Sequence, residues 1–316
     1  MVVDNTQPEG DNPIGDFTVE FLGTQSSSNS ASRRDLGFTG QLGGKWYAVY
    51  GDVLWCDSGV TDPTEDTEGF HGMVRNAVSA LTDDPLVVDD LHLNDDEPVP
   101  HQKQFMPFNQ DWGETNTFGF GGTGIAETDP DSATGVLYYL VNDNEHYKGA
   151  GVAKIELVDD VPTVTDRYGD NGIWWNGDEV PKYGDVATYQ DVNSEYIYIL
   201  GNPPNNIQDF PDNKYVYMAR VPACDAFDLD KYEYWWGREQ GWKSEPLTEC
   251  GTVFLKTAPS PEGPWTEGKE IYKDEPIDGG LVYAGLAYPH LDESGETLTI
   301  GFTNNNWIRI IKVTFT

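Results

Sequence analysis

Short apolar runs rich in β-branched and aromatic residues recur along this chain from Phe17 to its C-terminal end. They alternate apolar with polar residues or stay apolar throughout, as in TVEFLG, KWYAVYG, GVLYYLVN, GVAKIEL, YIYILG, KYVYMARV, KYEYWWG, TVFLKTA, TLTIGFT and WIRIIKVTF. Turn signals such as NPPNN, SPEGPW and DESGET divide these runs. Only Gly72 to Leu81 could form a helix of any length. The sequence therefore predicts an all-β protein.

The predicted strands also group into recurring units. Thr123 to Arg167, Tyr189 to Gly237 and Tyr283 to Phe315 each carry a similar order of strand-like segments. A unit of roughly four strands that recurs along a chain is typical of a β-propeller, in which small sheets pack radially. We expect a five-bladed propeller in a single domain over residues 17–316. Residues 1–16 are polar, lack periodicity and are predicted to be a disordered tail.

One unit is shorter than its neighbours. After YEYWWG the chain passes through Cys250-Gly251 directly into TVFLKTAPSPEGPW and GKEIYK, which match the second half of a unit. Either the first half of this blade is missing, which would expose strand edges, or the unit is simply shorter. Thr248 to Thr252 is the suspected deletion junction, and the blade around residues 248–275 is expected to be incomplete.

The net charge of the chain disfavours some classes of binding partner. Its 316 residues include 54 Asp and Glu but only 19 Lys and Arg, a formal net charge of −35. Such a charge repels phosphate backbones and anionic membrane surfaces, and no run approaches the roughly 20 apolar residues of a membrane span. We therefore expect neither nucleic acid nor membrane as a partner, and a monomer whose ligand is a neutral polysaccharide or oligosaccharide.

No secretion signal precedes Phe17, yet acidic, aromatic-rich and Lys-poor composition is typical of extracellular hydrolases. We expect a secreted protein whose mature chain has been given a starting Met. The three cysteines, Cys56, Cys224 and Cys250, allow one disulfide or none, and their spacing does not decide between these.

Two carboxylates stand out in Ser32 to Trp55, SRRDLGFTGQLGGKWYAVYGDVLW. Asp35 precedes one strand-like run, and Asp52 follows Gly51 at the end of the next. Burial of a carboxylate costs several kcal/mol of folding free energy, so such a residue is usually paired with another group or has a functional role. On neighbouring strands the two could face one pocket, and paired carboxylates are what glycosidic bond cleavage requires. Alternatively, both residues belong to turns, where Asp and Gly are common.

Two further carboxylates are candidates for the same pocket. Glu127 follows GFGGTG (Gly119 to Gly124), whose glycines match a dinucleotide-binding turn, but a strand rather than a helix follows. The glycines more plausibly let an inner strand approach a central cavity, with Glu127 at an inner position or in a turn. Asp185 repeats the Tyr-Gly-Asp of Tyr50 to Asp52, and recurrence in a repeat protein also favours a structural turn.

Polar and aromatic residues elsewhere are candidates for sugar binding. His71, Arg75 and Asn76 lie in FHGMVRNAVSA, and an Arg near two carboxylates would lower the pKa of one of them. Trp112 could stack on a sugar ring, although a Trp is more often part of the core. AYPHLD adds Tyr288 and His290. The H-E-x-x-H, G-x-S-x-G and C-x-x-C motifs are absent, so we predict no metal and no cofactor.

These segments together resemble one family. The ordered set RRDLGFTGQLGGKWYAVYGDVLW, GVLYYLVN…GAGVAKIEL, YIYILGNPP…YVYMARVP, AFDLDKYEYWWG, TAPSPEGPW and VYAGLAYPHLDESGETLTIGFTNNNWIRIIKVTF is similar to the domain of unknown function 4185 family, in its fungal secreted branch. The resemblance spans roughly Phe17 to Phe315. It implies a five-bladed propeller related to arabinanase-type glycosidases, whose bacterial relatives are endo-acting hydrolases of D-arabinan. The family continues with further strands before its TVFLKTA-like piece, whereas this chain does not.

In such propellers the working carboxylates line the central cavity, and the positions that match here are Asp35 and Asp52. The sequence-based hypothesis is a secreted glycoside hydrolase that acts on a furanose-rich, arabinan-type polysaccharide. Asp35 and Asp52 would be the acid/base and base-or-nucleophile pair in an unassigned order, with Glu127 or Asp185 as a third carboxylate. The alternative hypothesis is a non-catalytic carbohydrate-binding propeller.

Overall fold

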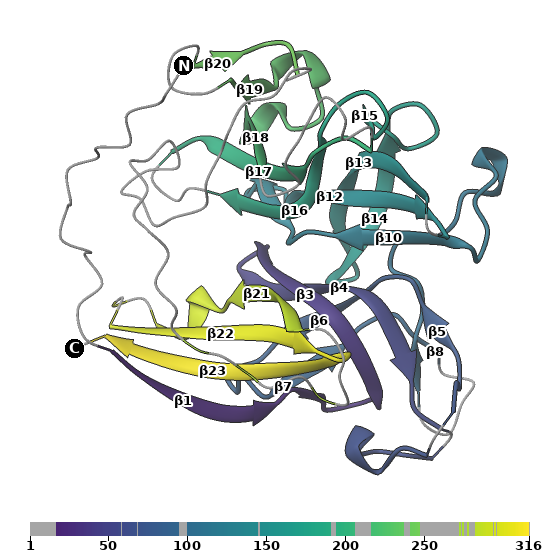
Figure 1. Cartoon of the computed structure of the whole chain (residues 1–316), viewed down its shortest axis with the longest axis vertical. Coiled ribbons are helices and arrows are strands. Elements are labelled where there is room, and N and C mark those ends of the chain that lie inside the picture. The colour runs from purple at the N-terminus through teal and green to yellow at the C-terminus, as the bar shows by residue number, and fades with distance from the viewer. Residues whose placement is uncertain are drawn as a thin grey trace.

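The computed structural model describes residues 17–57, 59–67, 69–94, 100–144, 146–190, 194–205, 216–236, 241–246, 282–292 and 296–315, with the single residues 272, 274, 277 and 294. These residues form β-strands and short 3-10 helices, and no α-helix occurs among them (Figure 1). The all-β prediction is confirmed. The strands form four larger sheets of four to six strands and one two-stranded sheet.

The first sheet contains the hairpin predicted around Asp35 and Asp52. Its strands pair in the order β2-β7-β6-β4-β3, and β5 also pairs with β4. Their bounds are β2 Ser26–Ser27, β3 Ser32–Leu42, β4 Lys45–Trp55, β5 Met73–Val74, β6 Ala77–Leu81 and β7 Val87–Asp90; the separate pair is β8 Leu93–Asn94 with β9 His101–Gln102.

The second sheet pairs β10-β12-β13-β14, with β11 on β12 and β15 on β13. These are β10 Phe118–Gly122, β11 Ala126–Asp129, β12 Thr134–Asp143, β13 His146–Val158, β14 Val161–Tyr168 and β15 Trp175–Asn176. The third sheet runs in chain order, β16 Lys182–Gln190, β17 Tyr196–Asn202, β18 Tyr217–Pro222, β19 Glu233–Trp235 and β20 Trp242–Lys243.

The fourth sheet joins the two ends of the chain. Its order is β1-β23-β22-β21, with β1 Phe17–Thr24, β21 Val282–Ala287, β22 Thr297–Asn304 and β23 Trp307–Phe315. Strand β1 pairs antiparallel with β23 over its whole length, so the first described strand completes the last sheet (Figure 1). The described 3-10 helices are η1 Pro63–Glu65, η2 Gln110–Trp112, η3 Ala223–Asp225, η4 Leu229–Lys231 and η6 Pro289–Leu291.

The sheets are arranged as a propeller. The strands at the inner edges of neighbouring sheets contact one another, from β21 to β3, to the segment after β10 and then to β16. Thr39 in β3 donates from Oγ1 to the carbonyl of Ala287 in β21 at 2.7 Å. On the other side of β3, Gly124 approaches the backbone of Thr39 closely. Thr188 in β16 then donates to Thr123 Oγ1 at 2.7 Å. We call Thr39, Thr123, Gly124, Thr188 and Ala287 the belt.

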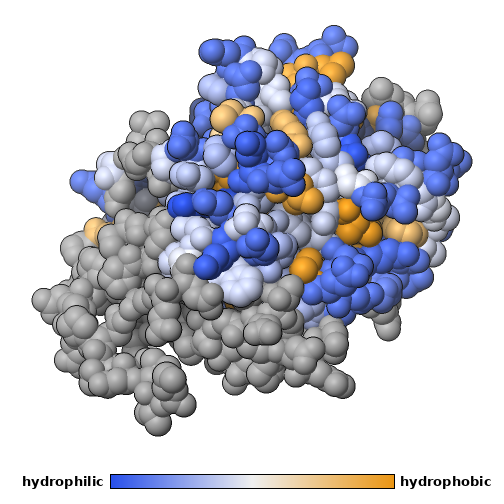
Figure 2. All heavy atoms as spheres, turned by 90° about the horizontal axis from the view of Figure 1, so that it is seen from above, coloured by the Kyte–Doolittle hydropathy of each residue, from blue (hydrophilic) through white to orange (hydrophobic). Residues whose placement is uncertain are grey.

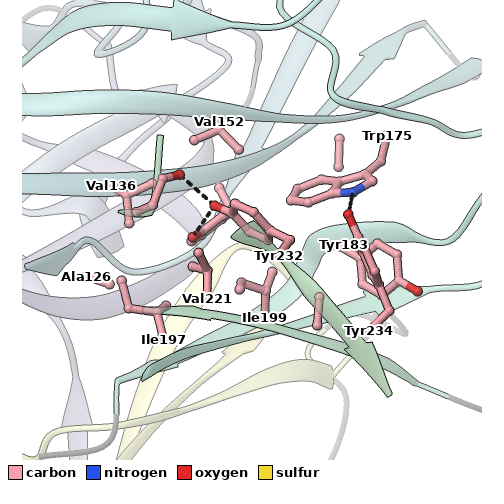
Figure 3. Packing of buried hydrophobic residues seen from close by; sticks show 14 of the residues in the cluster. Ala126, Val136, Val152, Trp175, Tyr183, Ile197, Ile199, Val221, Tyr232 and Tyr234 are labelled. Carbon is pink, nitrogen blue, oxygen red and sulfur yellow. Dashed lines mark hydrogen bonds between the residues drawn. The ribbon is translucent and has the colours of Figure 1, made fainter. Parts of the chain in front are cut away.

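Apolar cores fill the spaces between neighbouring sheets. One lies between the second and third sheets, and Figure 3 shows Val136 and Val152 facing Ile197, Ile199 and Val221 there. Large aromatic residues complete it, and burial of each such side chain contributes about 1.5–3 kcal/mol. The polar tips of these rings are satisfied: Trp175 Nε1 donates to Tyr234 Oη at 3.0 Å.

The structure bears on three predictions made from the sequence. Gly72 to Leu81 is not a helix: β5 and β6 pair with β4, and Gly72 has a φ of +117° that no helix allows. Of the GFGGTG glycines, Gly124 serves a close approach, to the backbone of β3 rather than to a central cavity. The described residues supply four blades, and Thr248 to Thr252 lies outside them.

Cys56 and Cys224 carry free thiols, and Cys250 lies outside the described residues. Over the part of the chain that the structure describes, no helix has the length and apolarity needed to cross a membrane. The face in Figure 2 is mostly hydrophilic and has only small hydrophobic patches, as the large net charge leads one to expect.

Candidate active site

A shift in the register between β3 and β4 places Asp35 opposite two residues in the middle of β4. In the register of these strands Arg34 pairs with Val53 and Leu36 pairs with Tyr50, so Asp35 alone faces Gly51 and Asp52. This is a β-bulge, a feature that often redirects a side chain next to an active site. The two carboxylates that the sequence singled out therefore lie on adjacent strands at one position of the first sheet.

The bulge is fixed by backbone and side-chain contacts. Leu36 has a φ of +62°, which is unusual for a residue with a branched side chain and costs of order 1 kcal/mol. Its N–H donates to Thr303 Oγ1 in β22 at 3.1 Å, so the fourth sheet holds it in place. A Cβ at position 51 would lie 2.5 Å from Asp35 Oδ1, so Gly51 leaves room for that carboxylate.

Strand β5 brings Arg75 to Asp52. Val53 pairs with Val74 and Leu54 with Met73, so Arg75 follows opposite Asp52, and Nη1 lies 3.5 Å from Asp52 Oδ2. The side chains are 36% and 41% exposed, so solvent reaches both. Partial burial raises the pKa of the Asp52 carboxyl above its ordinary value, and the Arg75 guanidinium opposes that rise.

Asp185 sits at a comparable position in the third sheet. Strand β16 is irregular between Tyr183 and Ala187, and Asp185 lies N-terminal to Thr188 in the belt, as Asp35 lies N-terminal to Thr39. Burial raises the pKa of Asp185 to about 6. Its carboxylate accepts from the N–H of Asn202 at 2.7 Å and from the side-chain amide of Asn202 at 3.2 Å. These bonds hold it to its own sheet.

Glu127 lies at the other end of β3. Its Oε1 accepts from the N–H of Gly43 at 2.6 Å, in the turn that joins β3 to β4. The structure thus does not bring Glu127 to Asp35 and Asp52, and Glu127 lies in strand β11 rather than in a turn. His290 is also at that end: its ring stacks on Trp46, at the start of β4, with 5.4 Å between centroids, and burial lowers its pKa.

The remaining candidates are held in structural contacts. Asn76 is fully buried, and its Oδ1 accepts from the N–H of Met106 at 2.8 Å. Tyr288 is buried, its hydroxyl accepts from Gln25 Nε2 at 2.9 Å, and burial raises its pKa. Trp112 packs under the Arg167 guanidinium at 4.9 Å, so one ring face is already occupied.

His71 lies in the loop between β4 and β5. Its Nε2 is 3.6 Å from Asp66 Oδ1, and its Nδ1 is 3.9 Å from Asp57 Oδ1. His71 and Arg75 do not share a helical face, because the segment is extended. No group of three or more His, Cys, Asp or Glu side chains is placed to hold a metal ion within the described residues.

Sequence reasoning missed Gln104, whose Oε1 accepts from the N–H of Arg75 at 2.9 Å. Nothing in the local sequence HQKQFM marks this residue, because its contact depends on a strand far away in the chain. Distances of 3.5 and 2.9 Å therefore connect Asp52, Arg75 and Gln104, and the strand register places Asp35 opposite Gly51 and Asp52. A pair of carboxylates with an adjacent guanidinium can move a proton and stabilise positive charge on a bound molecule.

No family model matches this chain, and no curated protein matches it. Among solved structures, an exo-β-1,3-galactanase from Phanerochaete chrysosporium with β-1,3-galactotriose is similar at a TM-score of 0.49 and 10% identity, covering 93% of this chain. This chain spans 63% of the length of that galactanase chain.

Two other structures are more distant. Trypanosoma rangeli sialidase has a TM-score of 0.39 and 11% identity, covering 92% of this chain and 47% of its own. A family 117 glycoside hydrolase from Zobellia galactanivorans has a TM-score of 0.36 and 12% identity, covering 93% and 75%. Likeness at this level assigns no residue, substrate or reaction to this chain.

Proposed function

We propose that this protein is a glycoside hydrolase that cleaves a furanose-rich, arabinan-type polysaccharide. The observation that carries the proposal is the β-bulge between β3 and β4, at which Gly51 and Asp52 of β4 face Asp35 of β3. Leu36, next to Asp35, has a strained backbone, and such strain is often found at active sites. Solvent access to Asp52 and Arg75 fits a site that a substrate can reach.

The environments of the two carboxylates suggest their roles. Asp52 is the general acid, because a carboxyl whose pKa is raised by burial keeps its proton at higher pH. Asp35 is then the nucleophile. Asp35 and Asp52 are on neighbouring strands, which lie about 4.7–4.9 Å apart. Such closeness suits the roughly 5 Å between carboxylates of retaining enzymes better than the roughly 6.5–9.5 Å of inverting ones.

The proposed reaction has two steps. Asp52 gives its proton to the glycosidic oxygen while the Asp35 carboxylate attacks the anomeric carbon, so the glycosidic bond breaks and a sugar ester of Asp35 forms. The Asp52 carboxylate then takes a proton from water, whose oxygen attacks the anomeric carbon and releases the Asp35 carboxylate. Both residues return to their starting states, and the sugar keeps its anomeric configuration.

Replacement of Asp52 by Asn tests the assignment. Asn is nearly the same size, so the fold should survive, but it cannot donate or accept the transferred proton. We expect reducing-sugar release from arabinan to fall at least about a hundredfold, the lower range for removal of an acid/base group. Asp131→Asn, at an exposed turn, is the matched control. Unchanged release by folded Asp52→Asn would exclude the assignment.

A carbohydrate-binding propeller without catalysis is the second candidate. The 3.5 Å contact between Arg75 and Asp52 favours it, because an adjacent guanidinium favours the ionised carboxylate over the acid. The two candidates differ in a simple assay. A binding protein would be stabilised thermally by arabinan or arabinogalactan and would release no reducing sugar from either.

Membership of the domain of unknown function 4185 family, secretion and a five-bladed ring are parts of the same proposal. The resemblance of the hairpin around Asp35 and Asp52 supports the family, and the acidic, Lys-poor composition supports an extracellular location. A screen of arabinan, arabinogalactan and other plant and fungal polysaccharides, with product configuration followed by NMR, would identify the substrate and the stereochemistry.

A further inference from the structure

Gln104 connects the candidate active site to the interior of the first sheet. Its side-chain oxygen accepts from the backbone N–H of Arg75 at 2.9 Å. Arg75 directly follows β5, a strand of only two residues, and the bond from its own N–H goes to Gln104. The guanidinium of the same residue lies 3.5 Å from Asp52. A shift of the Arg75 backbone would therefore change the charge that Asp52 experiences.

The segment that carries Gln104 is itself held firmly. Phe105 donates from its backbone N–H to the carbonyl of Asn76 at 3.2 Å, and Met106 donates to the Asn76 side chain at 2.8 Å. Gln102 donates from Nε2 to the carbonyl of Val78 at 2.9 Å. Gln104 thus projects from an anchored segment beside β5 and β6, and the buried Asn76 serves as that anchor rather than as a sugar ligand.

The nitrogen of the Gln104 side-chain amide takes no part in holding Arg75. This nitrogen, Nε2, is buried and has no hydrogen-bond partner within the described part of the chain. Most buried polar groups in folded proteins are paired, and an exception calls for an explanation such as a bound water or ligand. An acceptor for Arg75 alone does not require an amide, since a group without the spare N–H would meet the same need.

We propose that Gln104 is a substrate-positioning residue: its Oε1 fixes Arg75 beside Asp52, and its Nε2 donates a hydrogen bond to a hydroxyl or ring oxygen of the bound sugar. This inference rests on the proposed function for its second half only. Sugar oxygens suit this donor because they accept hydrogen bonds without a charge, and a neutral ligand does not disturb the ionisation of the adjacent carboxylates.

The first half is tested without any substrate. The titration of the Asp52 carboxyl is followed by carbon-detected NMR in the wild-type protein, in Gln104→Met and in Arg75→Met. Arg75 holds the pKa of Asp52 down against burial, so its loss should raise that pKa, and Gln104→Met should move it in the same direction. Gln41→Met, an exposed site at the far end of β3, is the control.

The second half is tested by binding. Calorimetry with a linear arabinan oligosaccharide compares Asp35→Asn, which cannot turn over, with Asp35→Asn carrying Gln104→Met. Loss of one hydrogen bond should weaken binding about tenfold. An Asp52 titration that is the same in folded Gln104→Met and Gln41→Met overturns the positioning role. Equal affinities overturn the sugar contact, and a parent that binds no oligosaccharide overturns that contact together with the proposed function.

Discussion

At the scale of single residues, Asp35 and Asp185 both lie at register irregularities, but their carboxylates have different neighbours. Both sit at irregularities in the first strand of a sheet, on the same side of the belt. Asp185 bonds back to Asn202 of the adjacent strand, which replaces pairing lost at the bulge. Asp35 faces a second carboxylate instead. The two carboxylates therefore differ in their neighbours and not in residue type.

The raised pKa of Asp185 has a consequence for stability. Its pKa in the folded protein is about 6, above the ordinary 3.8, so between these values the folded chain keeps a proton that the unfolded chain has released. The unfolded state then binds fewer protons, and stability must fall as pH rises through this window. Above pH 6 both states are ionised and the full penalty is present.

Replacement of Asp185 by Asn should remove this penalty. A shift of about two pKa units corresponds to at most about 3 kcal/mol. We expect the free energy of unfolding at pH 7.5 to rise by up to that amount relative to wild type, and the difference to vanish near pH 3.5. Urea denaturation at both pH values measures it, with Asp131→Asn as the control. Parallel pH profiles for wild type and Asp185→Asn would refute the linkage.

At the scale of elements, the first strands of the sheets pack backbone against backbone. Gly40 in β3 lies so close to the carbonyl of Ile125 that a Cβ there would collide with the main chain, which cannot move aside as a side chain can. Gly121 in β10 is also in a first strand, but a Cβ there would meet only side-chain atoms at ordinary contact distances. The approach of β3 to the second sheet therefore depends on one glycine and not on the other.

Alanine at these two positions tests whether the cost of replacing a glycine comes from a collision of the added Cβ with the neighbouring backbone. Gly40→Ala must push the two sheets apart, and we expect it to cost about 3 kcal/mol or more in the free energy of unfolding. Gly121→Ala should change that quantity by less than about 1 kcal/mol. Urea unfolding curves of both variants give the comparison. Similar costs for the two would mean that the belt is not close-packed.

Local patterns were sufficient to predict most of the described strands and the hairpin that carries Asp35 and Asp52. Alternation fixes a strand within a few residues, and a hairpin joins two strands across a short turn, so both depend only on neighbours in the sequence. The same reasoning failed for Gly72 to Leu81, where β4 captures an ambiguous segment as β5 and β6.

Contacts between distant residues were beyond such patterns. The partner of Glu127 is Gly43, 84 residues away, and the partner of Tyr288 is Gln25, 263 residues away. Glu127 was a candidate because it follows GFGGTG and Tyr288 because polar aromatic residues suit sugar binding, and the sequence does not reveal which partner either residue finds. Gln104 was missed for the opposite reason, since it gains its importance only through the backbone of Arg75.

At the scale of the whole molecule, the buried ion pairs leave the full excess of negative charge, −35, on the other side chains. Two of the few arginines are spent on buried ion pairs: Arg34 with Asp90 at 2.9 Å and Arg167 with Glu114 at 2.7 Å. These four side chains are no more than 7% exposed. Without these two pairs the chain has 52 acidic and 17 basic side chains, and the mutual repulsion of so many carboxylates opposes the compact state.

Salt should then stabilise this protein. The Debye length falls from about 30 Å at 0.01 M to about 3 Å at 1 M, which screens repulsion between exposed carboxylates but leaves the buried pairs nearly unaffected. We expect the melting temperature to rise by about 5 °C from 0.01 M to 0.5 M potassium chloride at pH 7.5, with most of the rise below 0.2 M. Sodium chloride at equal ionic strength should give the same curve, and sucrose at equal osmolality should not. A melting temperature that falls with salt would mean that attraction between exposed charges outweighs their repulsion.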